Sequence, residues 1–325
     1  MPVISSIINL KGGVGKTTIT VALAHFLAIE HGKRVLVIDL DPQTNATVCL
    51  IPEDEWKHRD ETGRTLYQLF ADAVKGTHKF NADDAIVRDV SNVGGGVRGL
   101  DLLPSSLRLI KIQDRVTQMT DFESYERGPI FAMRDALASF LPYYDHILID
   151  CPPSLGIVTL NGLALSDSYI IPVVPDMLSV LGIPPILDRV EHFARCTRRN
   201  IRALGIVVSK MRAQTVLHTE MLRRLREDFI DRHFPPVFNT VVPESMRIAE
   251  AANVMAPTNT LQQKYGSGGP YDDLSALTRE YLAYVARGPP AGRPPPRGGG
   301  GRAGARARRH RRNPKPRRGP RGEHG

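Results

Sequence analysis

Apolar runs of strand length alternate along this chain with segments whose apolar residues recur at helical spacing. Val3–Ile8 has the length and composition of a buried strand, and Thr18–Glu30 has helical spacing followed by Gly32, a common helix stop. Further strands are expected at Arg34–Leu40, Leu100–Leu103, His146–Asp150, Ser168–Val174, Ala203–Ser209 and Val237–Val242. Further helices are expected at Thr65–Val74, Ser105–Met119, Met177–Arg195 with an interruption at Pro184-Pro185, Leu217–Ile230 and Tyr271–Val285. The alternation predicts the fold class α/β, with one doubly wound, mainly parallel sheet and helices on both faces.

A glycine-rich turn lies between the first strand and the first helix, where the chain reads Leu-Lys-Gly-Gly-Val-Gly-Lys-Thr-Thr from residue 10 to residue 18. A strand, a glycine-rich turn and a helix in this order aim backbone N–H groups and a positive helix end at one point, which suits a phosphate. The standard phosphate loop has glycine where Leu10 stands, and Lys11 is an additional charge. Lys16 can reach the β- and γ-phosphates, and the Thr17 hydroxyl can ligate Mg²⁺. The expected nucleotide-binding residues of this turn are Lys11, Gly12, Gly13, Val14, Gly15, Lys16, Thr17 and Thr18.

Acidic residues follow two of the predicted strands. Asp39 and Asp41 stand at the end of Arg34–Leu40, and Asp150 ends His146–Asp150. Ligands of open α/β sheets bind at the carboxyl ends of the strands, and an acid at a strand tip beside a phosphate loop is placed to hold Mg²⁺ through water. An Asp-Pro pair alone would only indicate a turn, but its position about thirty residues after the glycine-rich turn favours a common site.

The glycine-rich turn resembles the deviant Walker A motif, Lys-Gly-Gly-x-Gly-Lys-Thr-Thr, of the ParA/MinD family of P-loop ATPases. The strings Asp-x-Asp-Pro-Gln from Asp39 and Asp-Cys-Pro-Pro-Ser-Leu-Gly from Asp150 resemble the family's other two motifs, in the right order and spacing. The resemblance covers about residues 1–286 and implies ATP and Mg²⁺ as cofactors. It implies catalytic roles for Lys11, Lys16 and Asp41, with Asp41 positioning the attacking water. It also places Asp39 and Asp150 with Thr17 around Mg²⁺.

The resemblance further implies that ATP closes a homodimer, in which Lys11 reaches the partner's nucleotide. The segment from Pro243 to Ala251 resembles a family segment near the adenine base, so Pro243 is expected close to the base, although Glu244 stands where the family usually has arginine. In the family, basic residues in and near the helix expected here at Leu217–Ile230 bind DNA without sequence preference. They correspond in this chain to Arg212, Arg223, Arg224 and Arg226. Arginines on a helix more commonly form only a solvated face. The implied function is ATP-driven positioning of chromosome or plasmid DNA with a ParB-type partner, in the cytoplasm on the nucleoid.

The positive charge of the chain is confined to its end. Of the 43 lysines and arginines and the 34 acids, residues 287–325 contain 13 and one, so this segment has a net charge of +12 and the rest a net charge of −3. Proline, glycine and arginine dominate the segment, which cannot bury a core and is expected to be disordered. The sequence therefore predicts an ATPase domain at 1–286 and a basic tail at 287–325.

Other features exclude several classes of protein. No apolar run approaches the length of a membrane span, the first residues do not form a signal peptide, and the three widely spaced cysteines indicate a reducing cytoplasm without disulfides. The resemblance also argues against an iron–sulfur cluster, because Cys49 and Cys196 lie far from the cluster positions of the related nitrogenase iron protein. Three alternatives stay open: a relative that positions another cargo on the nucleoid, a MinD-like membrane switch, and a metabolic P-loop enzyme such as an amidoligase or a synthetase. The composition of the tail is poor material for the amphipathic helix of a membrane switch, and nothing after Asp150 indicates the substrate pocket of a metabolic enzyme.

Overall fold

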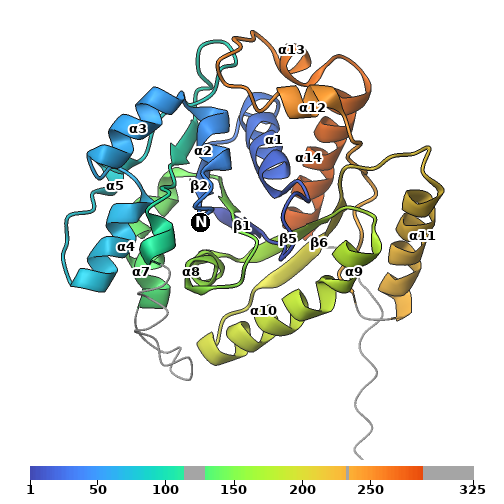
Figure 1. The fold of residues 1–325 in the computed structure, drawn as a ribbon, viewed down its shortest axis with the longest axis horizontal. Helices are drawn as coiled ribbons and strands as arrows, with labels where there is room; N and C mark the ends of the chain where they lie inside the picture. Colours follow the sequence, from blue (N-terminus) through green and yellow to red (C-terminus); the bar gives the residue numbers. More distant parts are fainter. Residues whose placement is uncertain (113–128, 232–233, 288–325) are drawn as a thin grey trace, which may run out of the picture. The chain divides into compact units, whose positions relative to one another are not determined.

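The computed structural model describes residues 1–112, 129–231 and 234–287. Six parallel strands form one sheet in the order β3-β2-β4-β1-β5-β6 (Figure 1). Their bounds are β1 Val3–Ile7, β2 Val35–Asp39, β3 Leu100–Leu103, β4 His146–Asp150, β5 Ser168–Val173 and β6 Arg202–Val208. The chain leaves β1 toward one edge for β2 and β3, and it reaches the other edge with β5 and β6. The turn after β1 therefore lies where the winding direction reverses, which is where open α/β sheets bind ligands.

Helices cover both faces of the sheet, as Figure 1 shows. Alternate strand residues enter two separate hydrophobic clusters, so Leu36 and Ile38 pack on one face while Val35 and Val37 pack on the other. The first face is covered by α4 (Leu66–Lys75), α7 (Ala132–Leu137), α8 (Ile157–Leu165) and α10 (Ile183–Thr197), and the second by α1 (Lys16–Ile29), α2 (Asn45–Leu50) and α14 (Gly269–Arg287). The doubly wound α/β fold predicted from the sequence is thus confirmed.

Shorter elements connect or follow these layers. They are α3 (Glu53–Glu61), α5 (Ala82–Ala85), η1 (Pro129–Phe131), η2 (Leu141–Tyr143), α9 (Met177–Leu181), α11 (Val216–Asp231), α12 (Met246–Glu250) and α13 (Leu261–Tyr265). The expected interruption near Pro184 falls at Gly182, between α9 and α10. Both prolines then lie at the start of α10, where backbone N–H groups have no intrahelical acceptor.

The predicted strand at Val237–Val242 is wrong. Val237 makes an isolated parallel bridge to Ile206 of β6, and Pro243 makes another to Met211 beyond the end of β6, but no strand continues between the two bridges. The reason is that the Glu280 carboxylate of α14 accepts the N–H groups of Asn239 and Thr240, at 2.7 and 2.9 Å. These two donors are therefore diverted from a sheet ladder.

Two other predictions fall partly outside the described residues. Of the helix expected at Ser105–Met119, residues 109–112 are helical and the positions from 113 onward are not described. The basic tail predicted at 287–325 also lies outside the described residues, apart from Arg287, which ends α14. All described residues belong to one compact unit within Met1–Arg293. Among them, no helix combines the length and the apolar character that crossing a membrane requires.

Candidate functional site

The glycine-rich turn leaves the carboxyl end of β1, which lies between β4 and β5 in the sheet. Gly13 and Gly15 have φ values of 76° and 81°, in the left-handed region that favours glycine, and Gly15 is the N-cap of α1. The buried Ser209, just after β6, holds the turn in place, because its hydroxyl donates a 2.7 Å hydrogen bond to the Val14 carbonyl. Gly12 and Gly13 are exposed, so this part of the turn is accessible to a ligand.

Lys16 is folded back along the turn that carries it. Its Nζ donates to the carbonyl oxygens of Asn9 and Lys11, at 3.3 and 3.2 Å, and the side chain is buried. Burial lowers the pKa of Lys16, although the carboxylates of Asp150 and Asp41 act in the opposite direction. A buried ammonium group with two neutral acceptors would gain strongly from a phosphate nearby.

Lys11 points to a different part of the site. Its Nζ donates to both oxygens of Asp176, at 3.0 and 2.8 Å, and to the Ser179 hydroxyl at 3.2 Å. Asp176 is the N-cap of α9 and also accepts the Ser179 N–H at 2.8 Å. Burial alone would raise the pKa of Asp176, but the hydrogen bonds from Lys11 and Ser179 hold it below its ordinary value. No pattern in the sequence predicts this partner, which lies 165 residues from Lys11.

The structure brings Thr17 and Asp150 together. Thr17 Oγ1 donates to Asp150 Oδ2 at 2.6 Å, and Thr20 Oγ1 donates to Asp150 Oδ1 at 3.3 Å. Burial raises the pKa of Asp150 to about 7, against the opposing effect of the Thr17 hydrogen bond. A hydroxyl and a carboxylate at one point are oxygen donors of the kind that Mg²⁺ prefers. Among the described residues, no group of three or more His, Cys, Asp or Glu side chains could hold a metal ion, so an ion here would need ligand or water oxygens as well.

Asp39 is adjacent to Asp150 in the sheet but makes other contacts. It is fully buried at the end of β2, and its Oδ2 accepts from both the N–H and the hydroxyl of Thr47, at 2.9 and 2.7 Å. Its Oδ1 accepts the Asp41 N–H at 3.1 Å. Burial, together with the charge of Asp150, raises the pKa of Asp39. These bonds anchor α2 and the turn that carries Asp41, and a place for Asp39 near Mg²⁺ stays a prediction.

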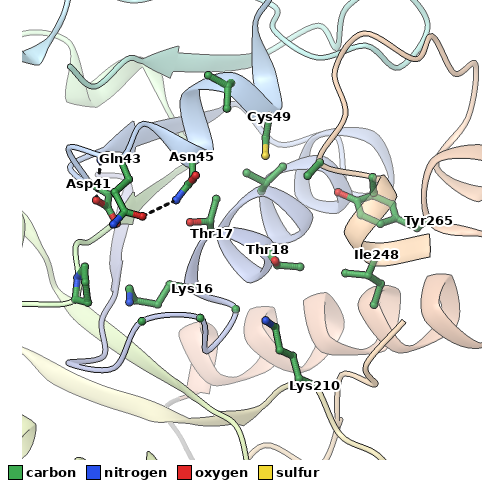
Figure 2. A pocket seen from close by; sticks show the side chains of 18 residues that line it. Lys16, Thr17, Thr18, Asp41, Gln43, Asn45, Cys49, Lys210, Ile248 and Tyr265 are labelled. Carbon is green, nitrogen blue, oxygen red and sulfur yellow. Dashed lines mark hydrogen bonds between the residues drawn. The ribbon is translucent and has the colours of Figure 1, made fainter. Parts of the chain in front are cut away.

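Asp41 and the glycine-rich turn line a single cavity of about 370 Å³, a volume within the range of small-ligand sites (Figure 2). One end of it is formed by residues predicted from the sequence, namely Gly12, Gly13, Gly15, Lys16, Thr17, Thr18 and Asp41. The other end is formed by further residues, including Val21, Val48, Cys49, Ile248, Ala251, Ala252 and Tyr265. Ile248 and Ala251 belong to the segment from Pro243 to Ala251 that was expected near the base, although Pro243 itself is not among the described residues that line the cavity. Sequence reasoning missed the others, which no local motif marks.

The four arginines expected to bind DNA are exposed, and each has a partner within the chain. Arg212 pairs with Glu244, and its Nη2 lies 3.1 Å from Glu244 Oε1. Arg223 and Arg224 both pair with Glu220 on α11, and Arg223 also pairs with Glu227. The remaining one, Arg226, donates to the Asn239 carbonyl at 3.1 Å. The structure places three of the four on α11 and leaves their role in DNA binding a prediction.

Comparisons with known proteins agree with this geometry. A family model described as an AAA domain matches residues 1–203. The sporulation initiation inhibitor protein Soj of Bacillus subtilis is 31% identical over 272 residues, which cover 84% of this chain and 96% of Soj. The chromosome-partitioning ATPase Soj of Treponema pallidum is 31% identical over 278 residues, which cover 85% and 95% of the two chains. The crystal structure of a Mycobacterium smegmatis cobyrinic acid a,c-diamide synthase with a bound ATP analogue and magnesium superimposes with a TM-score of 0.66, at 24% identity over 89% of this chain and 97% of that one. This last likeness concerns the fold.

Proposed function

Because this chain belongs to the Soj/ParA family of partitioning ATPases, we propose that it binds ATP with Mg²⁺ in the cavity beside the glycine-rich turn and hydrolyses it. The observation that carries the proposal is that the turn after β1 and Asp41 after β2 line one cavity, while Asp150 at the end of β4 contacts Thr17 of that lining. Phosphoryl transfer requires positioning and charge stabilisation rather than covalent chemistry from the protein, and these groups can supply both.

The phosphate chain would lie along the turn, with its oxygens on the backbone N–H groups and on Lys16. Lys16 now has only two carbonyl acceptors, at 3.2 and 3.3 Å, so exchanging them for phosphate oxygens costs little and gains charge-assisted bonds. Thr17 Oγ1 and the Asp150 carboxylate would hold Mg²⁺ together with phosphate and water oxygens. The ion, when bound, neutralises charge on the phosphate oxygens.

Asp41 would orient the attacking water. Its Oδ1 accepts the Gln43 N–H at 2.9 Å and its carbonyl accepts the Ser105 hydroxyl at 2.7 Å, so the residue is held on both sides while it lines the cavity. A carboxylate fixed in this way can accept a hydrogen bond from a water O–H without moving, which is what the orientation of a nucleophilic water requires.

The output of hydrolysis would be the positioning of chromosome or plasmid DNA. ATP would close a homodimer in which Lys11 exchanges Asp176 for the partner's nucleotide. The dimer would bind DNA through Arg212, Arg223, Arg224 and Arg226 on the nucleoid, and a ParB-type partner would stimulate hydrolysis and release it. The membership of the chain in the Soj/ParA family supports this cycle.

Two variants separate binding from chemistry. Lys16→Ala should abolish ATP binding, since it removes the buried ammonium group beside the turn. Asp41→Ala should bind Mg·ATP with near-normal affinity and hydrolyse it at least about 100-fold more slowly, because only the water-orienting group is lost. Equilibrium binding and single-turnover hydrolysis would measure the two effects, with Lys33→Ala at the opposite end of the sheet as the control. Wild-type hydrolysis by Asp41→Ala, or normal binding by Lys16→Ala, would contradict the proposed site.

A further inference from the structure

Lys210 lines the proposed nucleotide cavity between its two ends. It is exposed, and it directly follows Ser209, whose hydroxyl holds the glycine-rich turn at Val14. In Figure 2 the Lys210 side chain points into the cavity and lies between Lys16 on one side and Ile248 on the other. An amine in this place would face the part of a nucleotide that joins the terminal phosphates to the base.

The Lys210 ammonium group is available to a ligand. Among the residues that the structure describes, none forms a hydrogen bond or an ion pair with its Nζ atom. Glu244 senses its charge, but the Glu244 carboxylate is paired with Arg212, and the hydrogen bond from Arg212 is the main reason that the pKa of Glu244 lies below its ordinary value. A phosphate oxygen would therefore give Lys210 a charge-assisted hydrogen bond without breaking an existing one.

The backbone at Lys210 has a conformation that lysine rarely adopts. Its φ angle is 50°, in the left-handed region that favours glycine. A lysine costs free energy there that a glycine would not, so its presence points to a use for the side chain. Ser209 anchors the strained residue, because its hydroxyl bonds to the carbonyls of Val14 and Val173, at 2.7 and 3.3 Å. The amine is thus carried on a fixed segment beside the turn.

The place of Lys210 along the turn decides which phosphate it would contact. Lys16 Nζ lies against two carbonyls at the start of the turn. Lys210 follows the residue that packs at the other end of the turn, where a Cβ atom on Gly15 would lie 3.4 Å from Ser209 Oγ. Two ammonium groups at opposite ends of one turn suit different phosphates of a chain. With the terminal phosphates at Lys16, the phosphate that carries the sugar falls to Lys210.

We propose that Lys210 binds the phosphate nearest the sugar and thereby slows the release of ADP. The inference rests on the proposed nucleotide site and deepens it. ATP and ADP both have this phosphate, so hydrolysis removes the terminal phosphate and leaves the Lys210 contact in place. The side chain holds the product, and its grip sets how soon the protein can bind ATP again.

Lys210→Gly is the main test, because glycine removes the ammonium group and suits the left-handed backbone, so the fold should tolerate it. In calorimetric titrations this variant should bind Mg·ATP and Mg·ADP about 10-fold more weakly than wild type, by the same factor for both. Release of radiolabelled ADP, followed by rapid filtration after a chase of unlabelled ADP, should be about 10-fold faster. Both differences should shrink as ionic strength rises, because salt screens an exposed ammonium group.

Two further variants control for charge and for position. Lys210→Arg keeps a positive charge at the same place and should stay within about 3-fold of wild type for both nucleotides. Lys33→Ala removes a lysine at the opposite end of the sheet, outside the cavity lining, and should leave both affinities and the rate of ADP release at the wild-type values.

The outcomes separate the contact from the site. Wild-type protein that binds neither Mg·ATP nor Mg·ADP would overturn the nucleotide site itself. Wild-type ADP affinity and release in Lys210→Gly would overturn the Lys210 contact alone. A larger loss for ATP than for ADP would place Lys210 at the terminal phosphate and contradict the proposal, as would a similar loss in Lys33→Ala. Equal losses that Lys210→Arg restores would support it.

Discussion

Replacing Asp176 by asparagine should strengthen the ATP-dependent dimer. In the single chain, Lys11 Nζ is held by both Asp176 oxygens, at 2.8 and 3.0 Å. If Lys11 acts across the dimer interface, it must first leave Asp176, and the loss of this salt bridge opposes association. Asparagine removes the charge but remains a good helix N-cap, so α9 keeps its bond to the Ser179 N–H.

The expected size follows from the exposure of the pair. The Lys11 and Asp176 side chains are 38% and 28% exposed, so solvent screens the bridge and it contributes about 0.2–1 kcal/mol. A dimer breaks two such bridges, one in each protomer, which gives at most about 2 kcal/mol. The dimer dissociation constant of Asp176→Asn should therefore fall by up to ~30-fold.

Sedimentation equilibrium with a non-hydrolysable ATP analogue measures this constant. The gain should shrink as ionic strength rises, because salt already weakens the bridge in the wild-type protein. Glu191→Gln removes another ion pair, the one with Arg195 on α10, and serves as the control with an unchanged constant. A dimer of Asp176→Asn that is as weak as wild type, or weaker, would refute the reasoning and would assign Asp176 to the interface itself.

Two further predictions concern stability and DNA. The pKa of His25 in the folded state is about 3, below the ordinary value of 6.5. As the pH falls from 6.5 to 3, the unfolded chain therefore binds a proton at His25 that the folded chain does not, and the free energy of unfolding should decrease by up to about 1.4 kcal/mol per pH unit. In urea titrations at several pH values, His25→Gln should make this decrease smaller, and an unchanged pH dependence would contradict the assignment to His25. Truncation before Arg287 should abolish DNA binding in the presence of ADP and leave the binding that requires ATP unchanged. Fluorescence anisotropy at several salt concentrations would measure both. If the truncated and full-length proteins bind DNA equally well with ADP, the tail is passive.

The phosphate end of the site could be predicted because its determinants are local. The sequence from Lys11 to Thr18 encodes a strand, a turn and a helix start, and Asp150 ends a strand whose apolar composition is plain. The meeting of Thr17 with Asp150 then follows from strand order alone, since parallel strands end at one edge.

Most of the base end could not be predicted in this way. Its walls come from α1, α2, α12 and α13. The family resemblance pointed only to the segment that includes Ile248 and Ala251, and residues such as Val48 and Tyr265 have no spacing that marks a ligand. The partner of Lys11 is hidden for the same reason, because only the tertiary fold brings α9 beside the turn. The wrongly predicted strand at Val237–Val242 shows the converse. Its local sequence has the composition of a strand, but the distant Glu280 carboxylate accepts the N–H groups that a sheet would need.

The distribution of charge along the chain predicts two modes of DNA binding, which the overall net charge of +9 does not distinguish. Residues 1–286 have a net charge of −3, and the arginines expected to contact DNA are each engaged, Arg212 by Glu244 and Arg223 by Glu220 and Glu227. Three of the four arginines pair with glutamates, and Arg226 contacts a backbone carbonyl. Paired arginines give a single protomer little attraction for a polyanion, since an exposed pair must break before either charge is free. Binding by the core should therefore require the doubling of contacts that a dimer provides, which links it to ATP. Residues 287–325 contain 13 cationic side chains and one acid, so we expect this segment to attract DNA in a way that depends on salt and not on nucleotide. A protein built in this way would stay near DNA throughout its cycle, while the bound nucleotide decides only whether the core is engaged.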